Sequence, residues 1–459
     1  MRLSRDRIRA RVKSDLPITF SDERISSHAG LELFHRYFAT IDLAGRLRRV
    51  FQGLGVEGDY GAHRFVLCLV GLLLAGGRRI THLAVLERDP VLLRWIGLHR
   101  LPSDRTLVRW LKRLPFLVIE RLASLVQEIV HDAIERCGFS RLTIDADGSV
   151  LRTGVRVEGA ERGYNPHHPK DKSYYPLTAQ LAQTGQILRV WNRPGNVHDS
   201  HGAEGFLRTL LRDLRIRFGR RHALEVRLDG AFCQREILAF LDGEGLEYAI
   251  RLPLWKWLGI RSVIASRRRW TRVTGSVSGF SMELSIPQWG LHKRVGVYRK
   301  HVSHESRKNF QMDLFTPDDG HYEYSAVITN KTIGVAALWH FLAGRGAHEK
   351  TIAELKQQLA FDAIPTQHQL ANSVWLQISA LTHNLVRSFQ LAAGAPRRIH
   401  SWKRTYSYVF ESLQTLRFRL IQQPARIVRP AGRPELRFAV SQSTRRHIEQ
   451  IKHRIACAA

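Results

Sequence analysis

Cysteine and long apolar runs are scarce in this chain of 459 residues. The four cysteines, Cys68, Cys137, Cys233 and Cys457, are too few to cross-link a chain of this length and too far apart to form a zinc site. We therefore expect a reducing compartment and no structural zinc. The longest apolar run, residues 65–75, is shorter than the about 20 residues that cross a bilayer, so we expect a buried core helix there, no membrane span and a cytoplasmic protein without a cleavable leader.

Acidic residues are also few relative to basic ones. The 41 Asp and Glu residues stand against 71 Lys and Arg residues, and the resulting net charge of +30 is spread along the whole chain. Such a field attracts a polyanion, because neutralised phosphates release their counterions. Nucleic acid is the first candidate partner and an acidic membrane surface the second, with a merely soluble basic protein as the alternative. The hydrophobic content of 44% is enough for a buried core.

The first third of the chain predicts helices. From about residue 22 to 137, apolar residues recur at the spacing of an amphipathic helix. Within this part, Pro102 ends one helix and Ser103 is placed to cap the next, over residues 105–114, which bears Arg105 and Arg109. The pattern fits a helix-turn-helix and an ordinary helical hairpin with a solvated basic face equally well. Arg105 and Arg109 are candidate DNA-binding residues.

After Cys137 the apolar spacing changes to that of strands. The predicted elements are strands at 142–144, 173–180 and 186–191, a helix at 203–218, a strand at 224–228, a helix at 234–241 and a strand at 248–252. This order predicts an α/β mixed sheet. Short alternating segments, broken by Gly and Pro, then predict a β-rich insertion at 253–322. A strand at 324–328, helices at 334–361 and 370–392, and a basic final stretch follow.

Two aspartates stand where strands end. Asp147 and Asp229 each follow an apolar strand and precede a glycine, the position at which open α/β sheets bind their ligands. Two acids at neighbouring strand ends can share one metal ion, although acids in this position also cap turns. Asp145, two residues earlier, is an alternative to Asp147 as the first ligand.

Three charged residues share one face of a later predicted helix. Arg345, Glu349 and Lys356 coincide on that face because each residue of a helix turns by about 100°. Glu354 falls on another face. An exposed ladder of ion pairs has the same spacing and contributes only about a few tenths of a kcal/mol, so the spacing alone does not assign a function.

Together these residues resemble the DDE transposases of bacterial insertion sequences, over nearly the whole chain. The third-acid signature of that family is Tyr, two residues, Arg, three residues, Glu, six residues, Lys. Arg345, Glu349 and Lys356 fit it, whereas Leu342 stands at the tyrosine position. The run Asp147-Gly148-Ser149 matches the family context of the first acid. Further shared phrases are Gly163-Tyr164-Asn165, Ser173-Tyr174-Tyr175-Pro176-Leu177, Arg193-Pro194-Gly195-Asn196 and Ile328-Thr329-Asn330.

The resemblance implies a ribonuclease H-like mixed sheet with a β-rich insertion, preceded by an all-α N-terminal domain and followed by a helical basic tail. The implied division is 1–137 for a helical DNA-end-binding domain, 138–252 and 323–392 for the two parts of the catalytic core, 253–322 for the insertion and 393–459 for the basic C-terminal region.

It also implies metal-dependent cleavage and strand transfer at the ends of an insertion sequence. Asp147, Asp229 and Glu349 are then catalytic residues that ligate two Mg²⁺ or Mn²⁺ ions, which prefer oxygen donors. Arg345 and Lys356 are expected to bind the phosphate backbone. The implied partners are inverted-repeat transposon ends, target DNA and a second copy of the chain, in a nucleoid-associated homodimer.

Two alternatives stay open from the sequence. One is a catalytically silent DNA-binding protein derived from a transposase, and the other is a nuclease of the same fold that only hydrolyses. The presence of all three acids speaks against the first alternative. The second uses the same acids as a transposase, so the sequence does not separate these two.

Two further residue groups also fit two explanations each. Trp255, Trp257 and Trp270, which lie among Lys and Arg residues, fit stacking on an unpaired base or a small hydrophobic core with a basic rim. Zinc could be ligated by His198 and His201, or by the run Asn165-Pro166-His167-His168, but no thiol lies near them in the sequence, so a loop is favoured. The sequence favours the structural explanation for both groups.

Overall fold

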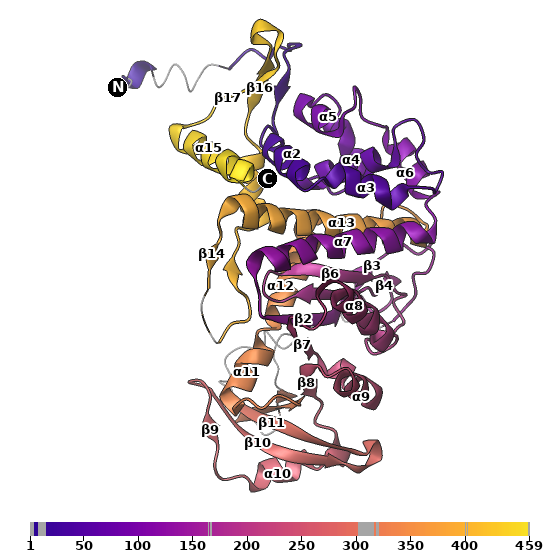
Figure 1. Ribbon diagram of the computed structural model, residues 1–459, viewed down its shortest axis with the longest axis vertical. Coiled ribbons are helices and arrows are strands. Elements are labelled where there is room, and N and C mark those ends of the chain that lie inside the picture. Colours follow the sequence, from indigo (N-terminus) through magenta and orange to yellow (C-terminus); the bar gives the residue numbers. More distant parts are fainter. Residues whose placement is uncertain are drawn as a thin grey trace.

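The computed structural model describes residues 4–7, 15–163, 165, 168–301, 316–317, 321–399, 401 and 403–457. Helices gather at one end of an elongated molecule, and a large sheet extends to the other end (Figure 1). In these residues no single helix is long and apolar enough to cross a membrane. Helices α4 (Ala62–Ala75) and η1 (Ile80–Leu86) meet the length and composition test only as a pair, which is bent by 79°.

Five strands form the centre of the sheet, in the spatial order β6-β5-β2-β7-β8. Strands β2, β7 and β8 pair in parallel, whereas β5 is antiparallel to both of its neighbours. In chain order this is 3-2-1-4-5 with only the second strand reversed, which is the topology of the ribonuclease H-like fold. The fold class expected from the sequence is confirmed. The bounds are β2 (Arg141–Gly148), β5 (Leu177–Leu181), β6 (Gln186–Trp191), β7 (Ala223–Leu228) and β8 (Glu247–Leu252).

Helices bury both faces of this sheet, which explains why its strands are apolar almost without alternation. Helices α8 (Ala203–Phe218) and α9 (Arg235–Gly243) pack on it through their apolar sides. Helices α7 (Phe116–Cys137) and α13 (Gln369–Phe389) lie side by side between the sheet and the helical end of the molecule (Figure 1), and both contact β6.

The strands of the predicted insertion continue the central sheet. Strand β13 (Tyr322–Thr329) pairs with the edge strand β8, β11 (Leu291–His301) pairs with β13, and β10 (Val277–Ile286) pairs with β11. Strand β9 (Thr271–Arg272) pairs with the other side of β10, and β12 (Thr316–Pro317) pairs with β13. The short helices η3 (Lys256–Leu258), α10 (Ile260–Ser266) and η4 (Pro287–Trp289) connect these strands. The predicted β-rich character is confirmed, but the sequence did not show that these strands extend the same sheet.

The amino-terminal helices share one apolar core with α12 (Gly346–Leu359), α13 and the carboxyl-terminal elements. Besides α4, η1 and α7, they are α2 (Leu31–Thr40), α3 (Leu43–Phe51), α5 (Pro90–Ile96) and α6 (Asp104–Leu111). The expectation of helices alone from residue 22 is wrong at Ile25–Ser26, which forms β1 and pairs with β16 (Ala425–Val428). A two-residue strand has too few side chains to show a period.

The carboxyl-terminal region contains one long helix and several short strands. Helix α15 (Gln442–Cys457) lies against α2 (Figure 1). The sequence did not indicate the hairpin of β16 and β17 (Glu435–Phe438). The remaining short elements are η5 (Gln390–Gly394), β14 (Arg397–Arg398), β15 (Tyr408–Val409), α14 (Leu413–Leu416), η6 (Arg417–Ile421) and η7 (Pro430–Gly432).

Two elements predicted as continuous are divided in the structure. The strand predicted at 173–180 becomes β4 (Ser173–Tyr174), which pairs with β3 (Leu151–Arg152), and β5, because Pro176 between them has no N–H to donate to a sheet. The helix predicted at 334–361 becomes α11 (Val335–Ala343) and α12 (Gly346–Leu359), which meet at Gly344.

Candidate active site

Strand register brings Asp147 and Asp229 to the same edge of the sheet. Asp145 of β2 pairs with Arg227 of β7 in parallel register. Asp147 and Asp229 each follow two residues later, so they lie at the ends of two adjacent strands. The guanidinium group of Arg345 bridges them. Its Nη1 lies 2.8 Å from Asp147 Oδ2, and its Nη2 lies 3.5 Å from Asp229 Oδ2.

Arg345 is held tightly in this position. Its side chain is 11% exposed. Burial by itself would lower the pKa of the guanidinium, but the charges of Asp147 and Asp229 outweigh burial and raise it. Arg345 therefore stays charged and offsets the repulsion between the two carboxylates.

Glu349, in the first turn of α12, lies within electrostatic reach of both aspartates. Burial raises the pKa of its carboxyl group, Arg345 lowers it, and the charges of Asp147 and Asp229 raise it further. The neighbouring His348 is fully buried, with Nε2 at 3.1 Å from Thr178 Oγ1, which in turn donates to the backbone carbonyl of Asp147. These two bonds fix the start of α12 against the end of β2. The three acids predicted from the sequence thus lie within electrostatic reach of one another.

The donors at this edge suit a hard divalent cation. Asp147 and Asp229 each direct an oxygen at one shared positive charge, and carboxylate oxygens are the preferred donors for Mg²⁺ and Mn²⁺. As the side chains stand, no three Asp, Glu, His or Cys residues in the described part of the chain converge closely enough to hold a metal ion. The residues therefore fit a metal ion in donor type and in the convergence of the two aspartates.

Asp145 is fully committed elsewhere. Its two oxygens accept from Arg227, Oδ1 from Nε at 2.6 Å and Oδ2 from Nη2 at 2.7 Å, and both side chains are completely buried. Arg227 also donates to the carbonyl of Phe341 and to Thr405 Oγ1. Because this forked pair occupies both oxygens of Asp145, its surroundings differ from those of Asp147, which lies at the partly exposed edge of the sheet.

The other residues singled out in the sequence lie in different settings. Lys356 is half-buried, donates to the backbone carbonyl of Val150 at 3.0 Å, and has its pKa lowered by burial. Leu342, at the family tyrosine position, is buried in an apolar cluster. Arg105 and Arg109 are exposed on α6, in the helical region of the molecule. Ser103 caps that helix as predicted, because its side chain accepts a hydrogen bond from Thr106 N.

Sequence patterns did not single out Asp199, Tyr175 and Arg193 as site residues, although Asp199 and Tyr175 lie beside Asp147 and Arg193 contacts both of them. A methyl group on Gly148 would lie 2.1 Å from Asp199 Oδ1 and 2.5 Å from Tyr175 Cε1, so both side chains contact the backbone directly after Asp147. Burial, followed by the charge of Asp147, raises the pKa of Asp199, which the hydrogen bond from Tyr175 lowers. The signals in the sequence were the family phrases at residues 173–177, which contain Tyr175, and at residues 193–196, which contain Arg193.

A cleft of about 760 Å³ opens beside Asp229. Its walls include Gly230, which follows Asp229, and the rings of Trp255, Trp257 and Trp289. Trp255 and Trp257 are stacked, with ring centroids 5.5 Å apart, and Trp257 is 45% exposed. Trp270 lies elsewhere and packs edge-on against Phe280.

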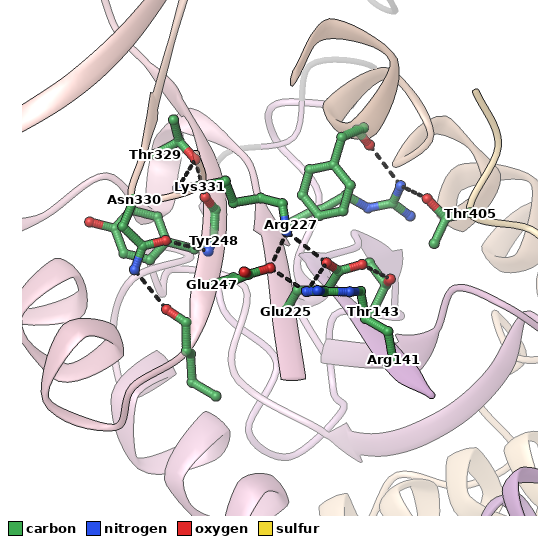
Figure 2. Close-up of polar contacts among 12 residues, drawn as sticks. Arg141, Thr143, Glu225, Arg227, Glu247, Tyr248, Thr329, Asn330, Lys331 and Thr405 are labelled. Atoms are coloured by element: carbon green, nitrogen blue, oxygen red, sulfur yellow. Dashed lines mark hydrogen bonds and ion pairs between the residues drawn. The ribbon is translucent and has the colours of Figure 1, made fainter. Parts of the chain in front are cut away.

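The opposite end of the sheet carries a network of charges that are mutually satisfied. Lys331 lies 2.8 Å from Glu225 Oε2 and also contacts Glu247, while Arg141 contacts both acids (Figure 2). Thr143 donates to the other oxygen of Glu225 at 2.5 Å. The network ties together the starts of β2, β7 and β8 and the end of β13.

Of the histidines considered as zinc ligands, the described ones lie in loops. His198 has Nδ1 at 2.8 Å from Ser200 Oγ, and His167 lies outside the described residues.

The strand order 3-2-1-4-5 with the second strand reversed, together with acids at the ends of the first and fourth strands, places the protein in the ribonuclease H-like class. The model of the family described as "Transposase DDE domain group 1" matches residues 9–459. The chain belongs to this family and is a DDE transposase, a nucleic-acid-cleaving enzyme that acts on DNA.

Solved transposase structures are similar to this chain only in part. The piggyBac transposase synaptic complex with hairpin DNA is 11% identical, with coverage of 92% of this chain and 85% of that chain and a TM-score of 0.46. The Mos1 mariner paired-end complex with Mn is 14% identical, with coverage of 37% and 57% and a TM-score of 0.18. The Mos1 paired-end complex with the left transposon end is 13% identical, with coverage of 53% and 65% and a TM-score of 0.18. No curated protein matches the chain.

Proposed function

We propose that Asp147, Asp229 and Glu349 are the catalytic residues of this transposase and that they hold two Mg²⁺ or Mn²⁺ ions during cleavage and strand transfer. The observation that supports this most directly is the single cation, Arg345, shared by Asp147 and Asp229. This shared contact indicates that the carboxylates of Asp147 and Asp229 are close enough to neutralise one positive charge together.

Each residue has a distinct part in this proposal. Asp147 and Asp229 supply fixed oxygens from the rigid sheet, and Glu349 approaches from the first turn of α12. When bound, the metal ions activate the attacking oxygen and stabilise charge on the leaving oxygen. Arg345 then exchanges its carboxylate partners for a phosphate of the DNA, to which its fork is equally suited.

We also infer how the DNA is bound. The helical region with Arg105 and Arg109 is proposed to bind the inverted-repeat ends, and Lys356 to approach the backbone near the acids. The tryptophan cleft suits an unpaired base, because aromatic rings stack on any base and the cleft is lined by Gly230, the residue directly after Asp229. Action on two ends at once calls for two copies of the chain, so we propose a homodimer in the DNA complex.

The test is cleavage of DNA that carries the inverted repeats flanking the coding frame, in Mg²⁺ and in EDTA. Asp147→Asn, Asp229→Asn and Glu349→Gln are expected to lower the cleavage rate by at least about 10³-fold and to leave DNA binding intact, because the basic surface is unchanged. Glu128→Gln, an exposed carboxylate on α7, is the matched control and is expected to cleave normally.

The alternatives predict different products. Tight binding without cutting in any metal would support a silent DNA-binding protein. Cutting without joining of the freed 3′ end to target DNA would support a nuclease that only hydrolyses. Joined products that depend on all three acids would support the proposal.

A further inference from the structure

The loop between β6 and α8 reaches the catalytic edge of the sheet. Tyr175, between β4 and β5, donates its hydroxyl to Asp199 Oδ2 at 2.9 Å. The ring of Tyr175 and the carboxylate of Asp199 both lie against Gly148, where a methyl group would clash with each of them. Asp147 is thus followed by a residue that is enclosed by two side chains from outside its own strand.

Arg193 holds both of these side chains in place. It is 1% exposed, and its Nε donates to the carbonyl of Tyr175 at 3.1 Å. Its Nη1 donates to the carbonyls of His198, Asp199 and His201, at 3.3, 3.3 and 2.9 Å. Its Nη2 lies 3.7 Å from Asp199 Oδ1. One buried guanidinium therefore fixes the backbone that carries Tyr175 and the loop that carries Asp199.

The same loop also contacts the chain after the second aspartate. Gln234, the residue directly before α9, donates to Ser200 Oγ at 2.7 Å. The loop thus spans from Gly148, after Asp147, to the segment that follows Asp229. It is placed to set the distance between the two strand ends.

Fold stability alone does not require such an arrangement. Burying an arginine and a carboxylate costs desolvation energy that apolar side chains of the same volume would avoid. Asp199 Oδ1 and Arg193 Nη2 are buried without a hydrogen-bond partner, so the cluster is not arranged for the best mutual satisfaction. Polar groups that are retained behind a metal ligand typically fix its orientation.

We propose that Tyr175, Asp199 and Arg193 are positioning residues for Asp147: Tyr175 and Asp199 clamp Gly148, and Arg193 holds the clamp. The proposal rests on the assignment of Asp147 as a metal ligand. When the clamp is loosened, the carboxylate of Asp147 moves relative to Asp229. Affinity for a divalent cation then falls although no ligand is removed.

The test measures Mn²⁺ binding directly, from the loss of the free Mn²⁺ signal in electron paramagnetic resonance, with the full-length chain. Asp199→Asn is expected to weaken Mn²⁺ binding by about 10- to 100-fold, as mutation of residues behind metal ligands does. Tyr175→Phe keeps the ring against Gly148 and loses only the hydroxyl, so a smaller loss is expected. Glu204→Gln, an exposed carboxylate at the start of α8, is the matched control and is expected to bind normally.

A second readout separates positioning from folding. The Mg²⁺ concentration that gives half-maximal cleavage is expected to rise in Asp199→Asn and Tyr175→Phe, with recovery of most of the rate at saturating metal. The thermal unfolding temperature without metal is expected to stay near that of the wild type. If Asp199→Asn does not fold, Tyr175→Phe decides, and wild-type Mn²⁺ affinity in that variant would overturn the clamp.

Failure of the clamp and failure of the assigned ligands give different results. If Asp147→Asn loses Mn²⁺ binding while Asp199→Asn and Tyr175→Phe bind as tightly as the wild type, only the clamp is wrong. If Asp147→Asn binds Mn²⁺ as the wild type does, Asp147 is not a ligand, and both proposals are wrong.

Discussion

Asp145 and Asp147 are two residues apart on one strand, yet their surroundings assign them different roles. Asp145 is completely buried in a forked pair with Arg227, whereas Asp147 is at the partly exposed edge. Every second residue of a strand faces the same side, so the two carboxylates share one face of β2, and they differ in their distance from the end of the strand at Gly148. Asp145 thus serves the stability of the sheet, whereas Asp147, whose partner Arg345 is shared with Asp229, is the residue that we propose as a metal ligand.

Asp145→Asn is expected to destabilise the protein by about 3 to 5 kcal/mol, because Arg227 is left buried without its countercharge. Asp147→Asn is the matched control. It is expected to cost much less, since Arg345 keeps Asp229 as a partner. Urea denaturation of both variants measures the difference. Equal losses would show that Arg227 finds compensation elsewhere.

His131 on α7 makes stability depend on pH. It is buried against the edge of Phe218, and burial lowers its pKa to about 4 from a value of 6.5. Between these values the unfolded chain binds a proton that the folded chain excludes. Stability is therefore full above about pH 6.5 and falls as the pH drops towards 4, by roughly 3 kcal/mol for this group.

His131→Phe is expected to remove this part of the acid sensitivity, since the replacement cannot be protonated. His99→Gln, at an exposed position, is expected to leave it unchanged. Unfolding in urea at pH 7.5 and pH 5 measures both. An unchanged pH dependence in His131→Phe would mean that other groups cause the loss.

Among the elements, the joint between α11 and α12 decides where Glu349 lies. A methyl group at Gly344 would be 2.4 Å from Arg227 Nη1, so the chain passes close to the buried pair at this point. At Gly346, two residues later, a methyl group would meet nothing within 4 Å. The break in the helix is thus set by a close approach to the sheet and not by helix propensity alone.

Gly344→Ala is expected to destabilise the protein by about 1 to 3 kcal/mol, because Arg227 is pinned and cannot withdraw. Gly346→Ala, the matched control, is expected to be neutral or to stabilise by up to about 1 kcal/mol, since alanine favours the helix. Thermal unfolding compares the two. Equal effects would show that the approach at Gly344 is readily relieved.

The tryptophans of the β-rich stretch separate into two groups. Trp257 is exposed in the cleft beside Asp229, while Trp270 packs between Phe280 and Arg299. Trp257→Ala is expected to weaken binding of DNA with an unpaired base by about 1 to 3 kcal/mol and to leave fully paired DNA almost unaffected. Trp270→Ala is expected to lower the unfolding temperature instead. Fluorescence anisotropy with both DNAs and a thermal melt measure these effects.

The whole molecule carries a net charge of +30, so its affinity for DNA depends strongly on salt. If Arg105 and Arg109 contact phosphates, Arg105→Gln and Arg109→Gln are each expected to reduce the slope of log affinity against log salt by about one. Arg208→Gln, which removes an arginine paired with Glu204 on α8, is expected to leave the slope unchanged. Titration of inverted-repeat DNA from 50 to about 200 mM salt measures it. An unchanged slope in both α6 variants would place the DNA elsewhere.

Long elements were predictable at the scale of the molecule, and short ones were not. Strand β6 and helix α8 have the predicted bounds, because a buried strand and a long amphipathic helix display their periods over many residues. Strands β1, β16 and β17 were missed, since two to four residues give no period and their pairing depends on distant partners. The domain division proposed from the sequence stays a prediction, and the helices of both ends share one core.

The sequence by itself determined the chemical types at the site: two strand-end aspartates, a glutamate in a basic helix and a positive field suited to DNA. These follow from composition and local spacing, which every residue carries with it. Only the tertiary structure decided that Asp145 is consumed by Arg227, that Arg345 bridges Asp147 and Asp229, and that Tyr175 and Asp199 enclose Gly148. Such contacts join residues that are tens to hundreds of positions apart. They form only when parallel strands pair across long connections and helices pack on the sheet, and both depend on distant partners.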